Sequence, residues 1–259
     1  MLKIIPIPAL TGTYDNYIWL LHNDRQAIVV DPGDAAPVLA YLQKHRLSLS
    51  AILITHRHND HIRGIAELVK VYNNPVYGPR LENIAGVTQT LGEPDHVEID
   101  ALGLRFKVLD IPGHTLGHIA YLGHDMLFCG DTLFGCACGK MFEGTPTQFH
   151  ASLQKLANLP DKTQVYCAHE YTESNVRFAL LCEPDNAQLQ QRQRDVRVLR
   201  EHGKPTLPSD IALEKATNPF LRCNTPQIIA SIAHHFELTS LPTNEIAVFA
   251  ALRTWRDHF

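Results

Sequence analysis

The sequence lacks the features that mark several protein classes. Its 259 residues include six cysteines, but they form no Cys-x-x-Cys pair and no dense framework, so neither a disulfide scaffold nor a paired-cysteine metal motif is indicated. No apolar run is long enough to span a bilayer, and the opening residues lack the apolar stretch and cleavage site of a signal peptide. No glycine begins a phosphate-binding loop. We therefore expect a protein of the reducing cytoplasm.

An excess of charge of one sign is also missing. Charged residues make up 19% of the chain and the net charge is −4, which gives no reason to expect a nucleic acid or an anionic membrane as partner. A hydrophobic content of 45% is enough for a core, and the length fits one large domain or a domain with a smaller companion. We expect a monomer that acts on a small molecule.

Histidine is the residue that the sequence arranges in an unusual way. Residues 55–61 contain three imidazoles and one carboxylate, directly after the apolar residues 51–54, which we expect to form a buried strand. Burying these polar groups without partners is costly, and metal ions are their usual partners. The alternative is a polar surface loop in which histidine is enriched by chance. The tight spacing favours the metal.

Similar groups recur where later strand-like segments end. His114, Asp131 and His169 each follow a short apolar run and lie beside Gly, Pro or Ala. Loops at strand ends can bring distant ligands to one place. Seven ligands are too many for one four-coordinate zinc and suit two ions that share a carboxylate, although ligand type alone also admits iron or manganese. The candidate ligands are His56, His58, Asp60, His61, His114, Asp131 and His169.

Strands and helices alternate over the first two thirds of the chain. Many strands with a few intervening helices predict an α+β fold with two sheets packed together and covered by helices. Asp34 and Thr147 are the expected N-caps of two of these helices, whereas Gly33 and Gly64 read as turn or close-approach glycines. From about Thr172 the pattern becomes helical, with helices expected over residues 174–181, 188–201, 226–236 and 244–257. We predict one domain over residues 1–172 and a helical domain over residues 173–259.

Several other polar residues have a structural interpretation. His118 lies four residues after His114, and we assign it to packing or to orienting a ligand rather than to ligation. Four arginines lie within the helix expected over residues 188–201, and we interpret them as a solvated helix face rather than a binding patch. These are Arg192, Arg194, Arg197 and Arg200.

Taken together, these motifs resemble the glyoxalase II family of the metallo-β-lactamase superfamily. The His-x-His-x-Asp-His pattern of residues 56–61 would indicate only the superfamily. The Cys-Gly-Lys and Phe-Glu-Gly-Thr segments of residues 138–145 and the His-Glu-Tyr-Thr segment of residues 169–172 narrow it to the family. The resemblance runs nearly end to end and includes residues 15–19 and 30–33. It implies an αβ/βα sandwich of two mixed sheets with outer helices, followed by a C-terminal all-helical domain.

The resemblance also implies roles for the candidate ligands. His56, His58 and His114 would hold the first ion, and Asp60, His61 and His169 the second, with Asp131 as the bridge between two divalent ions, zinc in the first instance. The implied catalytic carboxylates are Asp131 and Asp60. The implied contacts to glutathione are Lys140, Phe142, Tyr171, Arg253 and Arg256. Without the resemblance, the two arginines would read as an ordinary charged C-terminus.

The implied reaction is hydrolysis of S-(2-hydroxyacyl)glutathione, chiefly S-lactoylglutathione, to a 2-hydroxy acid (D-lactate) and glutathione, as in methylglyoxal degradation. Phe142 departs from the pattern, because some members carry a tyrosine there, and we expect weaker glutathione binding. The main alternative is a mononuclear iron persulfide dioxygenase of the same superfamily, which fits the helical tail with Arg253 and Arg256 less well. Three further alternatives are less favoured. The net negative charge argues against a nuclease, the lack of a signal peptide against a β-lactamase, and the full ligand set against a non-catalytic metal-binding module.

Overall fold

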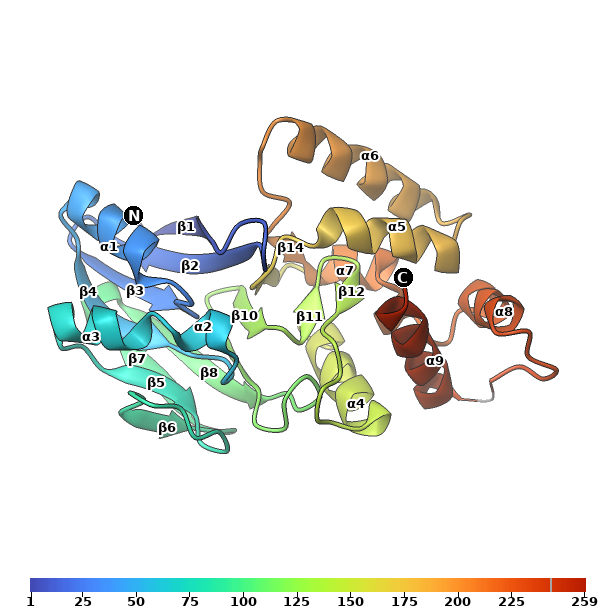
Figure 1. Ribbon diagram of the computed structural model, residues 1–259, viewed down its shortest axis with the longest axis horizontal. Coiled ribbons are helices and arrows are strands. Elements are labelled where there is room, and N and C mark those ends of the chain that lie inside the picture. The colour runs from blue at the N-terminus through green and yellow to red at the C-terminus, as the bar shows by residue number, and fades with distance from the viewer. Residues whose placement is uncertain (243) are drawn as a thin grey trace. The chain divides into compact units, whose positions relative to one another are not determined.

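The computed structural model describes residues 1–242 and 244–259 (Figure 1). The chain divides into two compact units, each of which draws on separate stretches of sequence. Unit 1 comprises Met1–Asp110, Gly117–Gly130 and Tyr166–His169. Unit 2 comprises Ile111–Leu116, Asp131–Val165 and Glu170–Phe259. In the described part of the chain, no helix is both long and apolar enough to cross a membrane.

The first sheet of unit 1 has six strands whose spatial order follows the chain. The first three strands are antiparallel, and the remaining neighbours are parallel, so this sheet is mixed. Its second strand is buried at every position, which explains why it reads as a continuous apolar run. The strands are β1 (Lys3–Ala9), β2 (Asn16–His22), β3 (Gln26–Val30), β4 (Ser48–Leu53), β5 (Val76–Pro79) and β6 (Gln89–Leu91).

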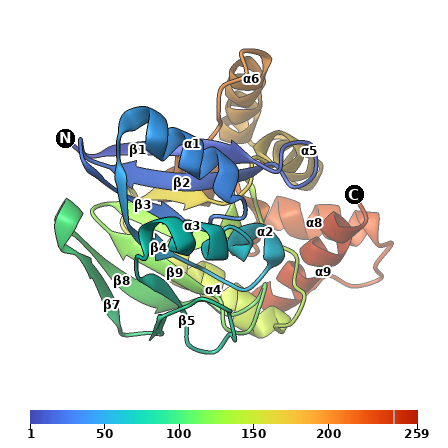
Figure 2. The same cartoon turned by 60° about the vertical axis from the view of Figure 1, so that its left-hand side comes forward.

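Helices α1 (Ala35–His45) and α3 (Ile65–Tyr72) cover this sheet on one face (Figure 2). Their buried side chains share one core cluster with strand residues such as Leu20 and Ile52. As predicted, the side chain of Asp34 caps α1 by accepting the N–H of Ala36 at 3.0 Å. The short helix α2 (Asn59–Ile62) lies between β4 and α3 and carries two of the candidate ligands.

The second sheet of unit 1 packs against the first. Its strands β7 (His96–Ile99), β8 (Leu104–Asp110), β9 (Ile119–Gly123) and β10 (Met126–Gly130) are antiparallel neighbours, with the end of β13 (Gln164–Cys167) beside β10 and the 3-10 turn η1 (Asp100–Leu102) between β7 and β8. The hydroxyl of Tyr121 donates to the carbonyl of Ile54 at 2.8 Å, and its burial raises the pKa of Tyr121 well above the ordinary value. The two packed sheets that the sequence predicts are therefore confirmed.

Unit 2 is mostly helical. A hairpin of β11 (Leu133–Phe134) and β12 (Ala137–Cys138) follows Asp131 in this unit. The strand β14 (Ser209–Asp210) pairs with the start of β13. The helical C-terminal region is confirmed, and one of its helices, α7, lies where the sequence pattern predicted none. The helices are α4 (Pro146–Ala157), α5 (Thr172–Cys182), α6 (Ala187–Glu201), α7 (Ile211–Thr217), η2 (Pro219–Leu221), α8 (Pro226–His235) and α9 (Glu245–Asp257).

The predicted N-cap at Thr147 is wrong. Thr145 caps α4 instead, and Gln148 completes a capping box with it. Pro146 occupies the first helical position, where its missing N–H costs nothing. The helix therefore begins two residues earlier than predicted.

The interpretation of Arg192 as part of a solvated face is also wrong. Its side chain is buried and its guanidinium donates to the buried carboxylate of Glu214 at 2.5 Å. Leu189, Arg192 and Val196 lie three and four residues apart, so they share the face of α6 that is covered. Arg194 and Arg197 are exposed as predicted, and Arg200 is partly exposed.

Candidate metal centre

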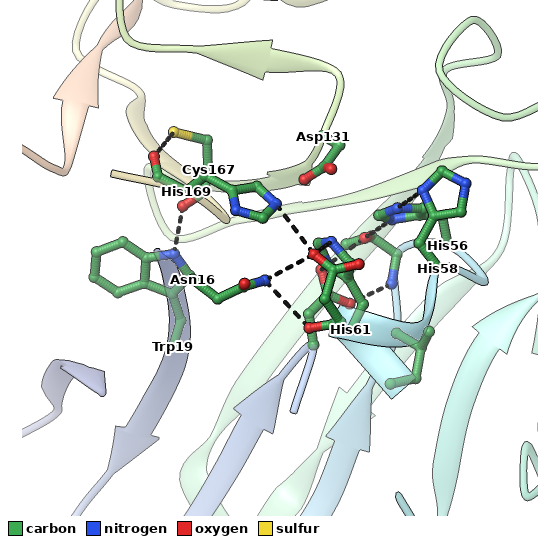
Figure 3. A network of polar contacts seen from close by, with 12 residues as sticks. Asn16, Trp19, His56, His58, His61, Asp131, Cys167 and His169 are labelled. Atoms are coloured by element: carbon green, nitrogen blue, oxygen red, sulfur yellow. Dashed lines mark hydrogen bonds and ion pairs between the residues drawn. The ribbon is translucent and has the colours of Figure 1, made fainter. Parts of the chain in front are cut away.

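The loop that follows β4 directs two imidazoles toward one another. Nε2 of His56 lies 3.0 Å from Nδ1 of His58. The two residues alternate along an extended segment, so their side chains can point the same way (Figure 3). His56 is fully buried and His58 is partly buried. The predicted convergence of these two side chains is therefore present in unit 1.

A second group of donors in unit 1 comes from α2 and from the end of β13. Oδ2 of Asp60 lies 3.3 Å from Nε2 of His61 and 3.5 Å from Nε2 of His169. His169 is brought here because Ala168 accepts the N–H of Tyr17 at 2.7 Å and donates its own N–H to Gly130 at 3.2 Å. Three donors from two separate segments thus meet within 4.8 Å of one another.

Unit 2 holds the remaining two candidate ligands side by side. Nε2 of His114 lies 3.4 Å from Oδ2 of Asp131, and both residues are almost fully buried. Gly139 packs so closely on them that a Cβ there would lie 1.9 Å from the carbonyl oxygen of Asp131 and 3.1 Å from Nδ1 of His114. Only glycine fits at this position without moving the ligands.

The spacing of these donors fits a metal ion. Two atoms that are each about 2.0–2.1 Å from a tetrahedral zinc lie about 3.3–3.4 Å apart. The nitrogen–nitrogen and nitrogen–oxygen distances within each unit range from 3.0 to 3.5 Å. Buried imidazole nitrogens and carboxylate oxygens are ligands of divalent ions. The chain therefore has a divalent metal-binding site.

In four of the candidate histidines, Nδ1 of the ring has a hydrogen-bond acceptor of its own. In metal sites this nitrogen normally donates to a carboxylate or carbonyl, which fixes the tautomer and the ring orientation. The acceptors are Thr55 Oγ1 for His56 at 3.1 Å, Asp31 Oδ2 for His61 at 3.1 Å, the Lys140 carbonyl for His114 at 2.7 Å and the Tyr14 carbonyl for His169 at 2.7 Å. In each of these histidines the other ring nitrogen is the one that would bind an ion.

Asp31 and Asn16 are functional residues that the sequence analysis did not single out. The Asp31 carboxylate accepts the N–H and the hydroxyl of Thr55, each at 2.7 Å, in addition to the ring of His61. Asp31 orients the candidate ligand His61, and it also forms with His56 and His61 a further group that could hold an ion. The side-chain amide of Asn16 donates to the carbonyl and to Oδ2 of Asp60, each at 3.2 Å. Asn16 begins β2 and Asp31 follows β3. Both lie in segments that supported the family resemblance, and that resemblance was the signal that could have identified them.

His118 packs in the way that the sequence suggested. Its ring stacks on that of His56, with centroids 4.6 Å apart and planes at 16°. Nδ1 of His118 lies 3.1 Å from the carbonyl of Ile119. The His118 ring thus packs against one face of the candidate ligand His56.

The predicted substrate residues of unit 2 fall into two groups. Phe142 is largely exposed and its ring lies 5.2 Å from that of His114, with Nζ of Lys140 5.5 Å above it. Tyr171 precedes α5, and its ring lies 5.7 Å from that of Phe134. Lys140 and Phe142 are therefore next to a candidate ligand.

The two C-terminal arginines make internal contacts. The buried guanidinium of Arg253 donates to the carbonyls of Cys138 at 2.9 Å and Gly139 at 3.2 Å, and to Asp257 at 3.0 Å. Arg256 donates to Oδ1 of Asn175 at 3.1 Å, and partial burial lowers the pKa of Arg256. Their contacts to glutathione stay a prediction.

Comparison with known proteins agrees with this description. The family model described as the metallo-β-lactamase superfamily matches residues 11–169, and the one described as the hydroxyacylglutathione hydrolase C-terminus matches residues 170–259. The hydroxyacylglutathione hydrolase of Photobacterium profundum is 52% identical, with both chains fully covered. That of Nitrosomonas europaea is 51% identical, covering all of this chain and 97% of the relative.

Two solved structures share the fold. ETHE1 from Myxococcus xanthus has a TM-score of 0.65 at 25% identity, covering 99% of this chain and 98% of that one. The BLEG-1 B3 metallo-β-lactamase has a TM-score of 0.62 at 26% identity, covering 85% and 99%. The predicted sandwich with a C-terminal helical region is thus confirmed. Because two family models together match residues 11–259 and relatives are about half identical from end to end, the chain belongs to the hydroxyacylglutathione hydrolase family of the metallo-β-lactamase superfamily.

Proposed function

We propose that this enzyme is a metal-dependent thioester hydrolase that cleaves S-(2-hydroxyacyl)glutathione to a 2-hydroxy acid and glutathione. The observation that carries the proposal is the set of buried nitrogen and oxygen donors at ligand spacing, in a chain that resembles hydroxyacylglutathione hydrolases over its whole length. The persulfide dioxygenase alternative is not favoured, because those full-length relatives carry the hydrolase name. S-Lactoylglutathione, giving D-lactate in methylglyoxal degradation, is the substrate that we propose to test first.

We further propose that seven ligands hold two ions. The number of donors exceeds what one tetrahedral ion needs, and a shared carboxylate is the usual bridge. Asp131 directly follows β10, and the segment that carries His114 joins β8 to β9. In this assignment zinc is the expected metal. His56, His58 and His114 hold one ion, Asp60, His61 and His169 hold the other, and Asp131 bridges them.

The protein's own groups then have defined tasks. Bound divalent ions supply a water of lowered pKa and polarise the thioester carbonyl. The carbonyl of Lys140 and the Asp31 carboxylate keep the rings of His114 and His61 oriented, so no reorganisation is needed during the reaction. The leaving thiolate is weakly basic and needs little protonation. This explains why the mechanism needs no dedicated general acid.

The substrate side of the proposal depends on unit 2. Lys140 is exposed, which suits it to pair with a glutathione carboxylate, and the adjacent ring of Phe142 offers an apolar surface. Tyr171, Arg253 and Arg256 complete the proposed set. We keep the division into a catalytic domain of residues 1–172 and a substrate-binding domain of residues 173–259, the monomeric state and the cytoplasmic location as proposals. The six cysteines are free and buried, which is compatible with a reducing compartment.

Metal removal and replacement tests this function. The protein is stripped with a chelator, assayed for cleavage of S-lactoylglutathione, and then reloaded separately with zinc, iron and manganese, with elemental analysis of each sample. We expect hydrolysis to disappear with the metal and to return at about two ions per chain. Full hydrolysis by the metal-free protein would refute the proposal. One iron per chain with oxygen uptake would favour the dioxygenase instead.

Phe142 gives a prediction about affinity. Phe142→Tyr restores a hydroxyl that other members use, and a hydrogen bond of about 0.5–1.5 kcal/mol corresponds to a KM about 2- to 10-fold lower, with kcat unchanged. The ring is largely exposed, so the added hydroxyl has room. Steady-state kinetics with S-lactoylglutathione measure this, with Tyr171→Phe as the matched removal of a hydroxyl. An unchanged KM for Phe142→Tyr would show that no such bond is available.

A further inference from the structure

Side chains hold the hairpin of β11 and β12 along most of its length. Six consecutive residues, 134–139, each have a backbone polar group hydrogen-bonded to a side chain from the helical part of unit 2. Figure 1 shows the hairpin beside α5 and α7. A hairpin of two-residue strands has few ladder hydrogen bonds of its own. Its conformation therefore depends on these helices.

Glu214 in the middle of α7 and Asn218 at its C-terminus hold the turn of the hairpin. The side-chain amide of Asn218 donates to the carbonyls of Phe134 at 3.2 Å and Ala137 at 2.9 Å. Oε2 of Glu214 accepts the N–H of Cys136 at 2.9 Å and the amide of Asn218 at 3.1 Å. Glu214 and Asn218 are completely buried.

Other helices hold the rest of the segment. The amide of Asn175 in α5 donates to the carbonyl of Gly135 at 3.0 Å. The guanidinium of Arg253 in α9 donates to the carbonyls of Cys138 and Gly139. Three separate helical elements thus converge on one short stretch of backbone.

A buried ion pair completes this arrangement. Oε1 of Glu214 accepts from Arg192 at 2.5 Å, and Arg192 also donates to Thr217 at 2.6 Å. A buried ion pair is weak evidence for a contribution to stability, because removing two charges from water is costly. Fixing one conformation of the groups around it is the better-supported role of such a pair.

The segment lies between two parts of the candidate metal centre. Asp131 precedes it, and the N–H of Gly139 donates to the carbonyl of Thr132 at 3.3 Å, which closes the loop on itself. Directly after the segment, the carbonyl of Lys140 accepts the Nδ1–H of His114 at 2.7 Å. A shift of the hairpin would therefore move both Asp131 and the group that orients His114.

We propose that Glu214 and Asn218 are positioning residues for the metal centre. By fixing the hairpin they set the places of Asp131 and His114, so the C-terminal helices determine how tightly the metal is retained. This inference rests on the proposed function, in which His114 and Asp131 are metal ligands. It assigns no contact with substrate to Glu214 or Asn218.

The test is Glu214→Gln in the metal-loaded enzyme. The replacement keeps the shape but turns one oxygen into a donor, which must then face Arg192 or the donors of Cys136 and Asn218. We expect release of metal to a chelator about tenfold faster, at the lower end of the effect seen when a ligand's orienting partner is lost. We also expect kcat to fall while the KM for thioester is maintained.

Glu183→Gln is the matched control. Glu183 is also buried and accepts from an arginine, Arg222, at 2.6 Å, but it makes no contact with the hairpin in the described hydrogen bonds and ion pairs. It should lose thermal stability in the same way and keep the wild-type rate of metal release. This separates positioning from general stabilisation.

Equal metal release from the wild type, Glu214→Gln and Glu183→Gln would overturn the inference and leave the proposed function standing. A wild-type protein that binds no metal would overturn both. If Glu214→Gln does not fold, Asn175→Ala removes the hydrogen bond to Gly135 together with the one that Asn175 accepts from Arg256, and metal release is compared in the same way. Faster metal release from that variant supports the inference, and an unchanged rate contradicts it.

Discussion

Replacing Asp131 by alanine is expected to reduce hydrolysis of S-lactoylglutathione by about 10³-fold or more. In the proposed assignment Asp131 is the only ligand that both ions share. Its loss leaves each ion one donor short and lets the two positive charges repel without a bridging anion. We expect the metal content to fall from about two ions to about one per chain, together with the loss of turnover.

The measurements for Asp131→Ala are steady-state kinetics and elemental analysis of the same preparation, with circular dichroism to confirm the fold. Asp24→Ala is a suitable control, because Asp24 is an exposed aspartate whose ion pair among the described residues is a 3.9 Å contact to Lys3. The control should match the wild type in both readouts. Normal hydrolysis by Asp131→Ala with full metal content would remove the bridging role from Asp131.

Gly33→Ala is expected to have the second largest effect, although Gly33 carries no chemistry. A Cβ at this position would lie 1.7 Å from the carbonyl oxygen and 2.4 Å from the carbonyl carbon of Asp60. Both are backbone atoms, so the clash cannot be relieved by a side-chain rotation and must move the helix that carries Asp60 and His61. A displacement of about 1 Å at a reacting centre costs about 100-fold in rate.

Overpacking a tightly fitted site also costs about 1–3 kcal/mol in the free energy of unfolding, and a contact with backbone should reach the upper end of that range. Chemical denaturation, metal content and kcat measure the three consequences of Gly33→Ala. Gly92→Ala is the matched control in the same unit, because the nearest atoms to its added Cβ are 3.5 Å away. A Gly33→Ala variant with normal metal content and kcat would show that α2 can shift without harm.

The candidate ligands could be proposed from the sequence because they follow short apolar strands in an unusually dense pattern. For the His-x-His-x-Asp-His stretch after β4, a metal could be inferred because buried groups of this kind need polar partners. The orienting role of Asp31 could not be predicted in this way. It depends on a hydrogen bond to His61, thirty residues further along the chain, and no local pattern encodes that contact.

The wrong predictions in the C-terminal helical region have a related cause. A pattern of charges along α6 shows which residues are charged but not which face a later helix will cover. Arg192 is buried because α7 supplies Glu214, and α7 itself was missed. Arg253 and Arg256 share a helix face as their spacing predicts, yet one donates to backbone carbonyls and the other to Asn175. Their partners come from tertiary structure alone.

The central claim is that seven side chains of this chain hold two metal ions. A crystal structure of the zinc-loaded protein, with anomalous diffraction recorded on both sides of the zinc absorption edge, tests it most directly. The claim predicts two anomalous peaks, one ligated by His56, His58 and His114, the other by Asp60, His61 and His169, with Asp131 bound to both. A single peak, or two peaks ligated by other residues, would contradict it.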